Sequence, residues 1–330
     1  MRTALALSAI YAQPVRIERI RAGRPKPGLA AQHLTAVRAM AELCRARLEG
    51  AELGSQTLTF IPARHPQPGR YTFDVAEARE GGSAGSTTLV LQTSLLPLAL
   101  ADGETHLTVR GGTHVSWSPP FHYLEMVYLP TLAHMGVRAT LELKKWGWYP
   151  IGGGEVMAEI RGPAKLRPLN LVERGQLKRL WGFSAASNLP SHIAQRQKKR
   201  AEQILRKFSP QIEIIDAPSP GKGTAVFLLA EFEGVRAGFT AYGALGKPAE
   251  EVAEEACREF LEYFSRGAAV DRHLADQLIL PLAVSGGQAA LSADKITRHL
   301  LTNIWVVEQF TGRKIEVEGE EGEKGMVRFT

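Results

Sequence analysis

Residues 105–161 read THLTVRGGTHVSWSPPFHYLEMVYLPTLAHMGVRATLELKKWGWYPIGGGEVMAEIR, and this stretch decides the fold. Its apolar positions change from alternation to a helical spacing and back, which predicts a strand, a helix and two strands. These predicted elements are Thr105–Gly111, Pro120–Gly136, Val137–Lys145 and Glu155–Arg161. An apolar helix within 83–101 precedes them. The order is therefore helix, strand, helix, strand, strand, with Gly136 suited to be the C-cap of the second helix.

The same order of elements is predicted at both ends of the chain. Near the N-terminus the elements are a helix at Thr3–Tyr11, a strand at Val15–Ile20, a helix at His33–Leu48, and strands around Ala51–Glu52, Thr57–Ile61 and Tyr71–Val75. The last copy has helices at Leu274–Ser285 and His299–Phe310, and strands at Gln288–Ser292, Lys314–Gly319 and Gly325–Phe329. A repeat in the order of elements indicates an architecture built from related units.

Residues 174–267 interrupt this repeat with a different pattern. They predict a strand, a basic amphipathic helix at Ser191–Phe208, three strands and an acidic helix at Pro248–Ser265. A segment with its own helices and strands is predicted to be an inserted small α+β domain. The remaining residues, 1–173 and 268–330, would then form a discontinuous core, and the fold class is α+β.

The composition is that of a globular protein with an anionic partner. The 330 residues are 44% hydrophobic and carry a net charge of +6, which argues against disorder and favours nucleic acid or a nucleotide as partner. No apolar run approaches the roughly 20 residues of a membrane helix, so we expect no membrane partner. Cys44 and Cys257 lie far apart in the sequence, which indicates free thiols in a reducing cytoplasm. The apolar start of the chain looks slightly like a signal peptide, but we interpret it as a folded helix.

The loop Arg21–Gly28 combines positive charge with stiffness. Arg21, Arg24 and Lys26 alternate with two prolines, and Gln32 and His33 follow at the start of the next helix. Guanidinium groups match the geometry of phosphate oxygens, so we predict a phosphate site at this loop.

Other motifs leave two interpretations open. Gly81–Thr88 precedes an apolar helix and fits either an anion cradle or a tight turn. Gly152–Gly154 follows the aromatic cluster of Trp146, Trp148 and Tyr149, and fits either a ligand-stacking site or, in preference, a hairpin turn. The spacing of His114 and His122 allows a metal pair, although no third ligand is spaced to complete it.

A candidate nucleophile lies near the C-terminus. His299 is followed by Thr302 and Asn303, and the polar pair Asp276 and Gln277 lies on the preceding predicted helix. A neutral imidazole is nucleophilic near pH 7, but the same pattern also suits a polar edge of a core.

Taken together, these segments resemble the RNA 3′-terminal phosphate cyclases. The segments that carry the resemblance are 20–29 (IRAGRPKPGL), 32–37 (QHLTAV), 50–56 (GAELGSQ), 82–93 (GSAGSTTLVLQT), 111–113 (GGT), 148–154 (WYPIGGG), 274–277 (LADQ) and 299–303 (HLLTN). The resemblance implies three βαβαββ repeats in a pseudo-threefold arrangement. It also implies an inserted domain similar to the C-terminal domain of translation initiation factor three.

The same resemblance implies an ATP-dependent ligase reaction in RNA processing. A histidine, at the position of His299, would carry AMP, the AMP would pass to an RNA 3′-terminal phosphate, and the 2′-hydroxyl would then close a 2′,3′-cyclic phosphate. The positions that match ATP contacts are Gln92, His273, Leu274, Ala275, Asp276 and Gln277. The family often has tyrosine where His273 stands. The positions that match contacts to the anionic substrate are Arg2, Arg21, Arg24, Gln32 and His33. A divalent metal, Mg²⁺ or Mn²⁺, should bridge the triphosphate.

One departure from the family concerns the start of the chain. The family usually begins with a strand and a segment ending Gly-Gly-Gly-Gln-x-x-Arg, which includes a metal-binding glutamate. Here Arg2 matches the final arginine, so the first repeat would lack its first strand and the metal ligands stay unassigned. We expect either a start codon placed too far downstream or a truncated form.

Three functions follow as alternatives. The first is an active cyclase, which the presence of His299 favours. The second is a catalytically impaired or non-catalytic RNA-binding relative of the kind used in ribosome assembly, which the missing Gly-rich motif favours. The third is an enzyme similar to the enolpyruvyl transferases, against which the His299 motif and the basic insert argue.

Overall fold

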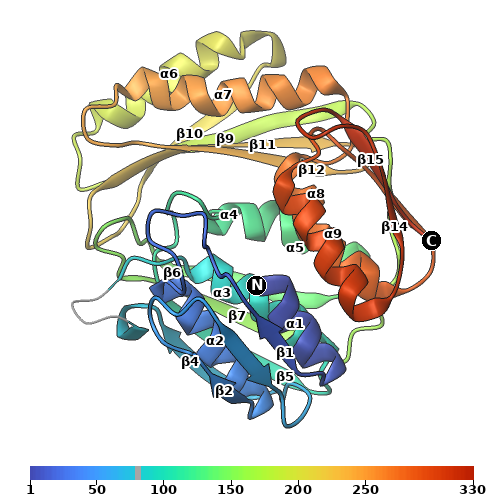
Figure 1. Cartoon of the computed structure of the whole chain (residues 1–330). Coiled ribbons are helices and arrows are strands. Elements are labelled where there is room, and N and C mark those ends of the chain that lie inside the picture. The colour runs from blue at the N-terminus through green and yellow to red at the C-terminus, as the bar shows by residue number, and fades with distance from the viewer. Residues whose placement is uncertain (79–82) are drawn as a thin grey trace.

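Four β-sheets with helices packed on them make up this computed structural model, which describes residues 1–78 and 83–330 (Figure 1). The fold is a mixed α+β fold. Three of the sheets share one strand order, which agrees with the repeat of elements predicted from the sequence.

The first sheet has the strand order β1-β3-β2 and is antiparallel throughout. Its strands are β1 (Val15–Ile17), β2 (Arg47–Glu49) and β3 (Leu58–Ile61). Helices α1 (Arg2–Tyr11) and α2 (Ala31–Cys44) belong to the same part of the chain.

The second and third sheets each add one parallel strand to that order, giving β4-β5-β7-β6 and β8-β13-β15-β14. The second comprises β4 (Arg70–Asp74), β5 (Glu104–Gly111), β6 (Arg138–Lys145) and β7 (Gly154–Arg161), with α3 (Thr87–Leu100) and the continuous helical segment α4 (Phe121–Tyr123), η2 (Leu124–Tyr128) and α5 (Leu129–His134). The third comprises β8 (Asn170–Leu171), β13 (Ala289–Ala293), β14 (Ile315–Glu318) and β15 (Gly325–Phe329), with α8 (Arg272–Ser285) and α9 (Arg298–Thr311).

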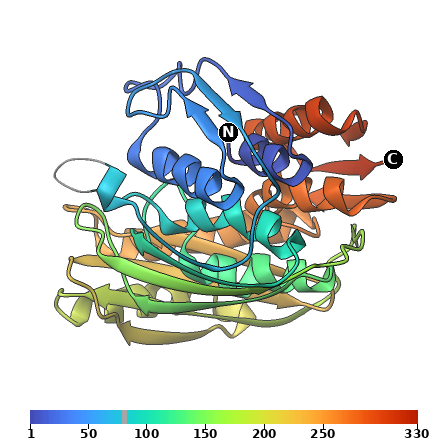
Figure 2. The same cartoon turned by 90° about the horizontal axis from the view of Figure 1, so that it is seen from below.

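The fourth sheet, of order β10-β9-β11-β12, belongs to the segment that interrupts the repeat. Its elements are β9 (Leu177–Ser187), α6 (His192–Ile204), η3 (Arg206–Phe208), β10 (Gln211–Asp216), β11 (Gly223–Phe232), β12 (Arg236–Tyr242) and α7 (Ala249–Arg266). This is the order of elements predicted for the segment. Figure 2 shows the sheet as a layer on the opposite side of the molecule from the N-terminal helices.

Two hydrophobic cores hold these layers together. The larger core joins α1, α2, α3, α8 and α9 to the first three sheets and includes one face of the fourth sheet, through Phe183 and Phe227. The smaller core lies between the other face of the fourth sheet and the helices α6 and α7, around Phe260 and Tyr263. The part of the chain that forms the fourth sheet therefore has a core of its own and also shares the main one.

One predicted strand is wrong. Ala51–Glu52 lies outside any strand, just before a turn at residues 53–54, and the strand that pairs with β3 is β2, at Arg47–Glu49. The reason is that α2 ends at Cys44, because Arg45 adopts the left-handed conformation, with φ of 48°, and begins the strand early. Gly50, with φ of 72°, then turns the chain at the position where the strand was predicted.

Two further observations bear on the sequence predictions. Cys44 and Cys257 are both free and buried, as expected. In the described residues, no helix combines the length and the apolar character that crossing a membrane would require.

Candidate active site

The first turns of several helices meet around a cleft with a volume of about 960 Å³. Arg2 lies in the first turn of α1, Gln32 and His33 in that of α2, and His299 in that of α9, while Ser83–Gly85 leads into α3. The N–H groups of a first helical turn have no partner within the helix, and the helix dipole adds positive potential there. A cleft built in this way is suited to an anionic ligand.

The charged side chains of the cleft strengthen this preference. Arg2, Arg21 and Arg24 line it, and no aspartate or glutamate is found among its described lining residues. The predicted phosphate-binding residues, which are Arg2, Arg21, Arg24, Gln32 and His33, are therefore all brought to one cavity. Lys26 from the same loop does not line it.

The loop that carries Arg21 and Arg24 has a defined shape. The guanidinium of Arg21 donates to the carbonyl of Gly28 at 2.9 Å, and the N–H of Gly28 donates to the carbonyl of Ile20 at 2.8 Å. Gly28 has φ of 79°, and a β-carbon there would lie only 2.0 Å from the carbonyl oxygen of Gly54. Only glycine fits this position, so the loop is closed and its two arginines are held at the cleft.

Gln32 and His33 connect α2 to the wall of the cleft. The side-chain oxygen of Gln32 accepts the N–H of Ser86 at 3.1 Å, and Ser86 is the N-cap of α3. Nδ1 of His33 accepts the N–H of Ala30 at 3.1 Å, so the ring proton of the neutral form is on Nε2. Burial, with Arg21 nearby, lowers the pKa of His33 to about 4. His33 thus offers a neutral N–H donor at neutral pH.

His299 stands exposed in the first turn of α9. The helix begins there because Thr297 accepts the N–H of Leu300 through its hydroxyl oxygen, at 3.1 Å. Asn303 lies one turn further on the same face. Its amide N–H donates to the carboxylate of Asp276, and its oxygen accepts the hydroxyl of Thr3 at 2.5 Å. The face of α9 that bears His299 is therefore joined to α1 and α8.

A smaller pocket, of about 30 Å³, adjoins the cleft and shares Arg2, Thr3 and Asn303 with it. Its other described lining residues are Gln92, Tyr128, Asp276, Gln277 and Leu280. Arg2 donates to the oxygen of Gln92, but the amide nitrogen of Gln92 and the oxygen of Gln277 are buried without a hydrogen-bond partner among the described residues. Buried polar atoms normally have partners, so these two indicate a polar ligand group at this end of the cleft.

The residues predicted to contact ATP divide between this inner pocket and the surroundings of α8. Gln92, Asp276 and Gln277 line the inner pocket. Leu274 and Ala275 are fully buried in the core. His273 is exposed at the start of α8, edge-on to Tyr123 with ring centroids 6.3 Å apart, and lines neither cavity. A helix presents successive side chains in different directions, which explains why a continuous run of five residues separates in space.

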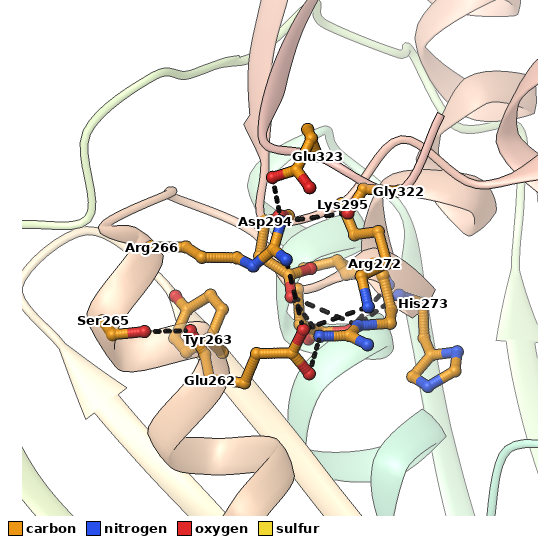
Figure 3. A network of polar contacts seen from close by, with 12 residues as sticks. Glu262, Tyr263, Ser265, Arg266, Arg272, His273, Asp294, Lys295, Gly322 and Glu323 are labelled. Atoms are coloured by element: carbon orange, nitrogen blue, oxygen red, sulfur yellow. Dashed lines mark hydrogen bonds and ion pairs between the residues drawn. The ribbon is translucent and has the colours of Figure 1, made fainter. Parts of the chain in front are cut away.

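An ion-pair network anchors the start of α8 (Figure 3). The guanidinium of Arg272 binds the fully buried carboxylate of Asp294 at 2.6 Å and that of Glu262 at 3.0 Å. Asp271 caps the helix by accepting the N–H of Leu274 at 3.0 Å, and it also accepts the hydroxyl of Tyr123 at 2.7 Å. The ends of α7 and β13 are thus tied to α8, which sets the position of Asp276 and Gln277.

No ready-made metal centre occurs in the described part of the chain, where no three histidine, cysteine or acidic side chains gather in ligand geometry. Asp276 is the one carboxylate among the described residues of the inner pocket, beside the unpartnered oxygen of Gln277. Magnesium is commonly held by one or two carboxylates together with phosphate oxygens of a substrate. These residues fit an ion of that kind.

His114 and His122 form a buried hydrogen-bonded pair, with 2.9 Å between Nε2 and Nδ1. Thr113 occupies the other nitrogen of His114 at 2.8 Å, and burial lowers the pKa of His122 to about 3. The idea of a metal pair is therefore wrong, because the facing ring nitrogens bind each other. Trp146 and Trp148 are buried beside them, which agrees with the preferred reading of a hairpin turn at core aromatics.

Sequence reasoning missed two residues of the cleft. Trp117 has no role in the sequence predictions, and Tyr149 belongs to the aromatic cluster for which a hairpin turn is preferred over a ligand-stacking site, yet both line the cleft with exposed rings. The exposure of one ring in a run of aromatics has no signal in the sequence. Of the predicted anion cradle at Gly81–Thr88, Gly81 and Gly82 lie outside the described residues, while Ser83–Gly85 lines the cleft.

Comparison with known proteins gives consistent matches over the whole chain. The family model described as RNA 3′-terminal phosphate cyclase matches residues 1–317. Three relatives carry that name. The one from Methylococcus capsulatus is 51% identical over 332 residues, which cover 100% of this chain and 92% of the relative. The one from Nostoc punctiforme is 50% identical over 319 residues, which cover 96% of this chain and 92% of the relative, and the one from Thermococcus gammatolerans is 46% identical over 331 residues, which cover 99% of this chain and 93% of the relative. Among solved structures, the enolpyruvyl transferase NikO from Streptomyces tendae matches 52% of this chain and 32% of its own at 19% identity, with a TM-score of 0.29, which is too low to support an argument.

Proposed function

This chain belongs to the RNA 3′-terminal phosphate cyclase family, and we propose that its cleft converts the 3′-terminal phosphate of RNA into a 2′,3′-cyclic phosphate. The activity is that of an ATP-dependent enzyme of the ligase class. The observation that carries the proposal is the position of His299, in a cleft lined by three arginines and by the first turns of several helices, a setting that favours phosphate.

The chemistry assigned to His299 begins with attack on ATP. A ring nitrogen forms a bond to the α-phosphorus, and pyrophosphate leaves with the electrons of the broken P–O bond. An oxygen of the RNA 3′-phosphate then attacks the same phosphorus, which breaks the P–N bond and leaves AMP on the RNA. Finally the neighbouring 2′-hydroxyl attacks the 3′-phosphorus, AMP departs, and the hydroxyl proton is lost. Imidazole suits the first two steps because it is both nucleophile and leaving group.

The remaining side chains hold and neutralise the reacting phosphates. We assign Gln92, Asp276 and Gln277 to the ATP side, because they line the inner pocket and two of them have unpartnered polar atoms. We assign Arg21, Arg24, Gln32 and His33 to the RNA phosphate. Arg2 lines both cavities and would interact with both substrates. A divalent ion carried by ATP would be held by Asp276 and Gln277 and would offset the charge of the triphosphate.

We infer the family architecture for the chain as a whole. Three βαβαββ units would surround a pseudo-threefold axis, with residues 174–267 inserted as a domain between β8 and α8. The shared strand order of three sheets supports this arrangement. A cytoplasmic location is also proposed, and the two free, buried thiols support it.

The test is the covalent intermediate. Incubation with α-labelled ATP and Mg²⁺ should leave AMP on the protein through an acid-labile, base-stable bond, and His299→Ala should abolish the label. His65→Ala, a change of another exposed histidine outside the cleft, is the matched control and should retain it. Label that persists in His299→Ala would overturn the role of this residue.

The RNA steps are separated by the choice of substrate. An oligonucleotide with a 3′-phosphate and a terminal 2′-hydroxyl should acquire a cyclic end. The same oligonucleotide with a terminal 2′-deoxyribose should accept AMP and stop there, because the attacking hydroxyl is missing. A protein that binds the RNA but forms neither product would instead be a non-catalytic RNA-binding relative.

A further inference from the structure

Two aromatic side chains stand nearly free of contacts at the cleft. Trp117 is 95% exposed and Tyr149 is 77% exposed. Among the described residues, the only other phenylalanine, tyrosine or tryptophan exposed by more than half is Trp305, at 60%. Trp117 and Tyr149 line the cleft, and Trp305 does not. Exposed aromatic rings that gather at one cavity indicate a ligand with a flat apolar face.

Hydrogen bonds hold the backbone on either side of Trp117, so the exposed position of its ring is fixed by the surrounding structure. The hydroxyl of Ser118 donates to the carbonyl of Val115 at 2.9 Å, and that of Thr88 donates to the carbonyl of Pro119 at 2.7 Å. Trp117 itself has φ of 66°, a left-handed conformation that is unfavourable for a bulky side chain. Such a conformation persists where the surroundings impose it, and such positions cluster at ligand sites.

Tyr149 is held in a comparable way. The preceding residue, Trp148, is 3% exposed, and its indole N–H donates to the hydroxyl oxygen of Ser187 at 2.7 Å. The N–H of Gly152 donates to the carbonyl of Trp148 at 2.6 Å and closes the turn. The ring of Tyr149 therefore projects from a turn that is fixed to the core on one side.

The surroundings identify the ligand as part of a nucleic acid. The same cleft presents Arg21 and Arg24 and no acidic side chain among its described residues. Aromatic rings next to phosphate-binding cations are the combination that binds single-stranded nucleic acid, in which the backbone meets the cations and the bases stack. The residues assigned to ATP line the inner pocket, whereas Trp117 and Tyr149 line only the larger cleft. Trp117 and Tyr149 share their cavity with Arg21 and Arg24, which we assign to the RNA phosphate, and they are not among the side chains assigned to ATP, so we place RNA bases rather than adenine on the rings.

We propose that Trp117 and Tyr149 form a stacking platform for the unpaired bases at the 3′ end of the RNA. This inference rests on the proposed function and specifies its substrate class, which is a single-stranded 3′ end of any sequence. Every base has a flat π-face, so the platform tolerates sequence. Bases in a duplex end are already stacked and paired, so such ends must fray before they bind.

The experiment compares RNA binding with AMP transfer in the full-length protein. Trp117→Ala and Tyr149→Ala should each raise the KM for a single-stranded 3′-phosphorylated oligonucleotide by between roughly 5-fold and 150-fold, with a smaller change in kcat. The conservative variants Trp117→Phe and Tyr149→Phe keep a ring and should recover most of the loss. Trp305→Ala removes an exposed aromatic outside the cleft and should leave the KM unchanged. AMP transfer from ATP to the protein, measured without RNA, should proceed in all of these variants.

A substrate change identifies the contact as stacking. Oligonucleotides that lack the terminal base, or the terminal two bases, should bind the wild type about as weakly as they bind Trp117→Ala or Tyr149→Ala. The inference is overturned if these variants change the RNA KM no more than Trp305→Ala does, or if abasic ends bind the wild type as well as intact ends. It is also overturned if the variants mainly slow AMP transfer, which would place adenine on the rings. Absence of the AMP adduct in the wild type would instead refute the proposed function.

Discussion

At the scale of one residue, His33 shows how burial in the cleft keeps a side chain neutral at neutral pH. Histidine ordinarily titrates near pH 6.5, but burial and the nearby Arg21 lower the pKa of His33 to about 4. Its ring contributes a hydrogen-bond donor at neutral pH, while the positive charge of the cleft comes from the arginines. The cleft thus holds one neutral donor, His33, among the arginines that line it.

The lowered pKa predicts a pH dependence of stability. A histidine that is kept neutral by folding stabilises the native state fully above pH 6.5, and this contribution is lost as the pH falls toward 4, because the unfolded chain takes up the proton first. His33→Asn keeps an acceptor for the N–H of Ala30 and cannot titrate. Between pH 7 and pH 5 the wild type should lose about 1 kcal/mol more unfolding free energy than the variant, allowing for solvent screening.

Urea unfolding at the two pH values measures this difference directly. His114 and His122 also have lowered pKa values and contribute to the loss in both proteins, so only the difference between the proteins reports on His33. Equal losses in wild type and variant would contradict the assignment.

At the scale of the element, helix α8 connects the site to the rest of the molecule. Its N-terminal end is held by Asp271 and Arg272, and its middle supplies Asp276 and Gln277 to the inner pocket. Residues 274–277 are consecutive in the sequence, but Leu274 and Ala275 pack in the core while Asp276 and Gln277 line the inner pocket. The motif therefore contributes two residues to packing and two to the lining of the inner pocket.

The anchor of α8 makes a testable contribution to stability. Arg272→Ala should lower the unfolding free energy by about 3–5 kcal/mol, because it leaves the buried carboxylate of Asp294 without its counter-charge. Arg16→Ala breaks an ion pair in which both side chains are more than half exposed, and should cost less than about 1 kcal/mol. Denaturant unfolding measures both.

A second variant distinguishes charge from packing. Replacing both partners with apolar residues, as in Arg272→Met with Asp294→Leu, removes the unpaired charge and should restore much of the loss. If the double variant is as unstable as Arg272→Ala, the network contributes through packing and not through charge compensation.

At the scale of the whole molecule, the arginines that contribute to the net charge of +6 differ in whether acidic side chains neutralise them. The basic helix α6 carries Arg196 and Arg200, but these pair with Glu250 and Glu254 of α7 at 2.6 Å each. The acidic start of α7 thus neutralises part of the charge of the basic amphipathic helix predicted at Ser191–Phe208. Arg2, Arg21 and Arg24, by contrast, face a cleft without acidic residues among those described.

The shared core predicts cooperative unfolding of the inserted segment with the rest. Phe227 of β11 stacks on Phe183 with centroids 5.4 Å apart, and His122 lies 4.6 Å from Phe183 across the junction with the second repeat. Urea unfolding followed by circular dichroism and tryptophan fluorescence should show one coincident transition. Phe227→Ala should lower the unfolding free energy by about 3–5 kcal/mol.

The control for this prediction is Ile214→Ala, which changes a side chain that is 47% exposed on β10 and should cost less than about 1 kcal/mol. Two separate transitions in the wild type would show that the two cores unfold independently and would contradict the prediction.

Patterns in the sequence were enough to predict the order of elements and its repetition, and to single out His299, Arg21 and Arg24 as candidate residues. These follow from periodicity and turn chemistry, which act over a few residues. The wrong strand at Ala51–Glu52 arose because a left-handed Arg45 ends α2 early, and no local pattern signals that conformation.

Only the tertiary structure decided which of these residues meet. Thr3 hydrogen-bonds to Asn303, which is 300 positions away in the sequence, and Arg2 to Gln92, which is 90 positions away. These contacts join elements that line the inner pocket. The same packing buries Leu274 and Ala275, leaves His273 outside the lining of both cavities, pairs two arginines of α6 with α7, and exposes Trp117 and Tyr149 at the cleft. Burial and ion pairing depend on residues that are distant in the sequence and become neighbours only in the folded chain. The local sequence around a residue therefore does not predict them.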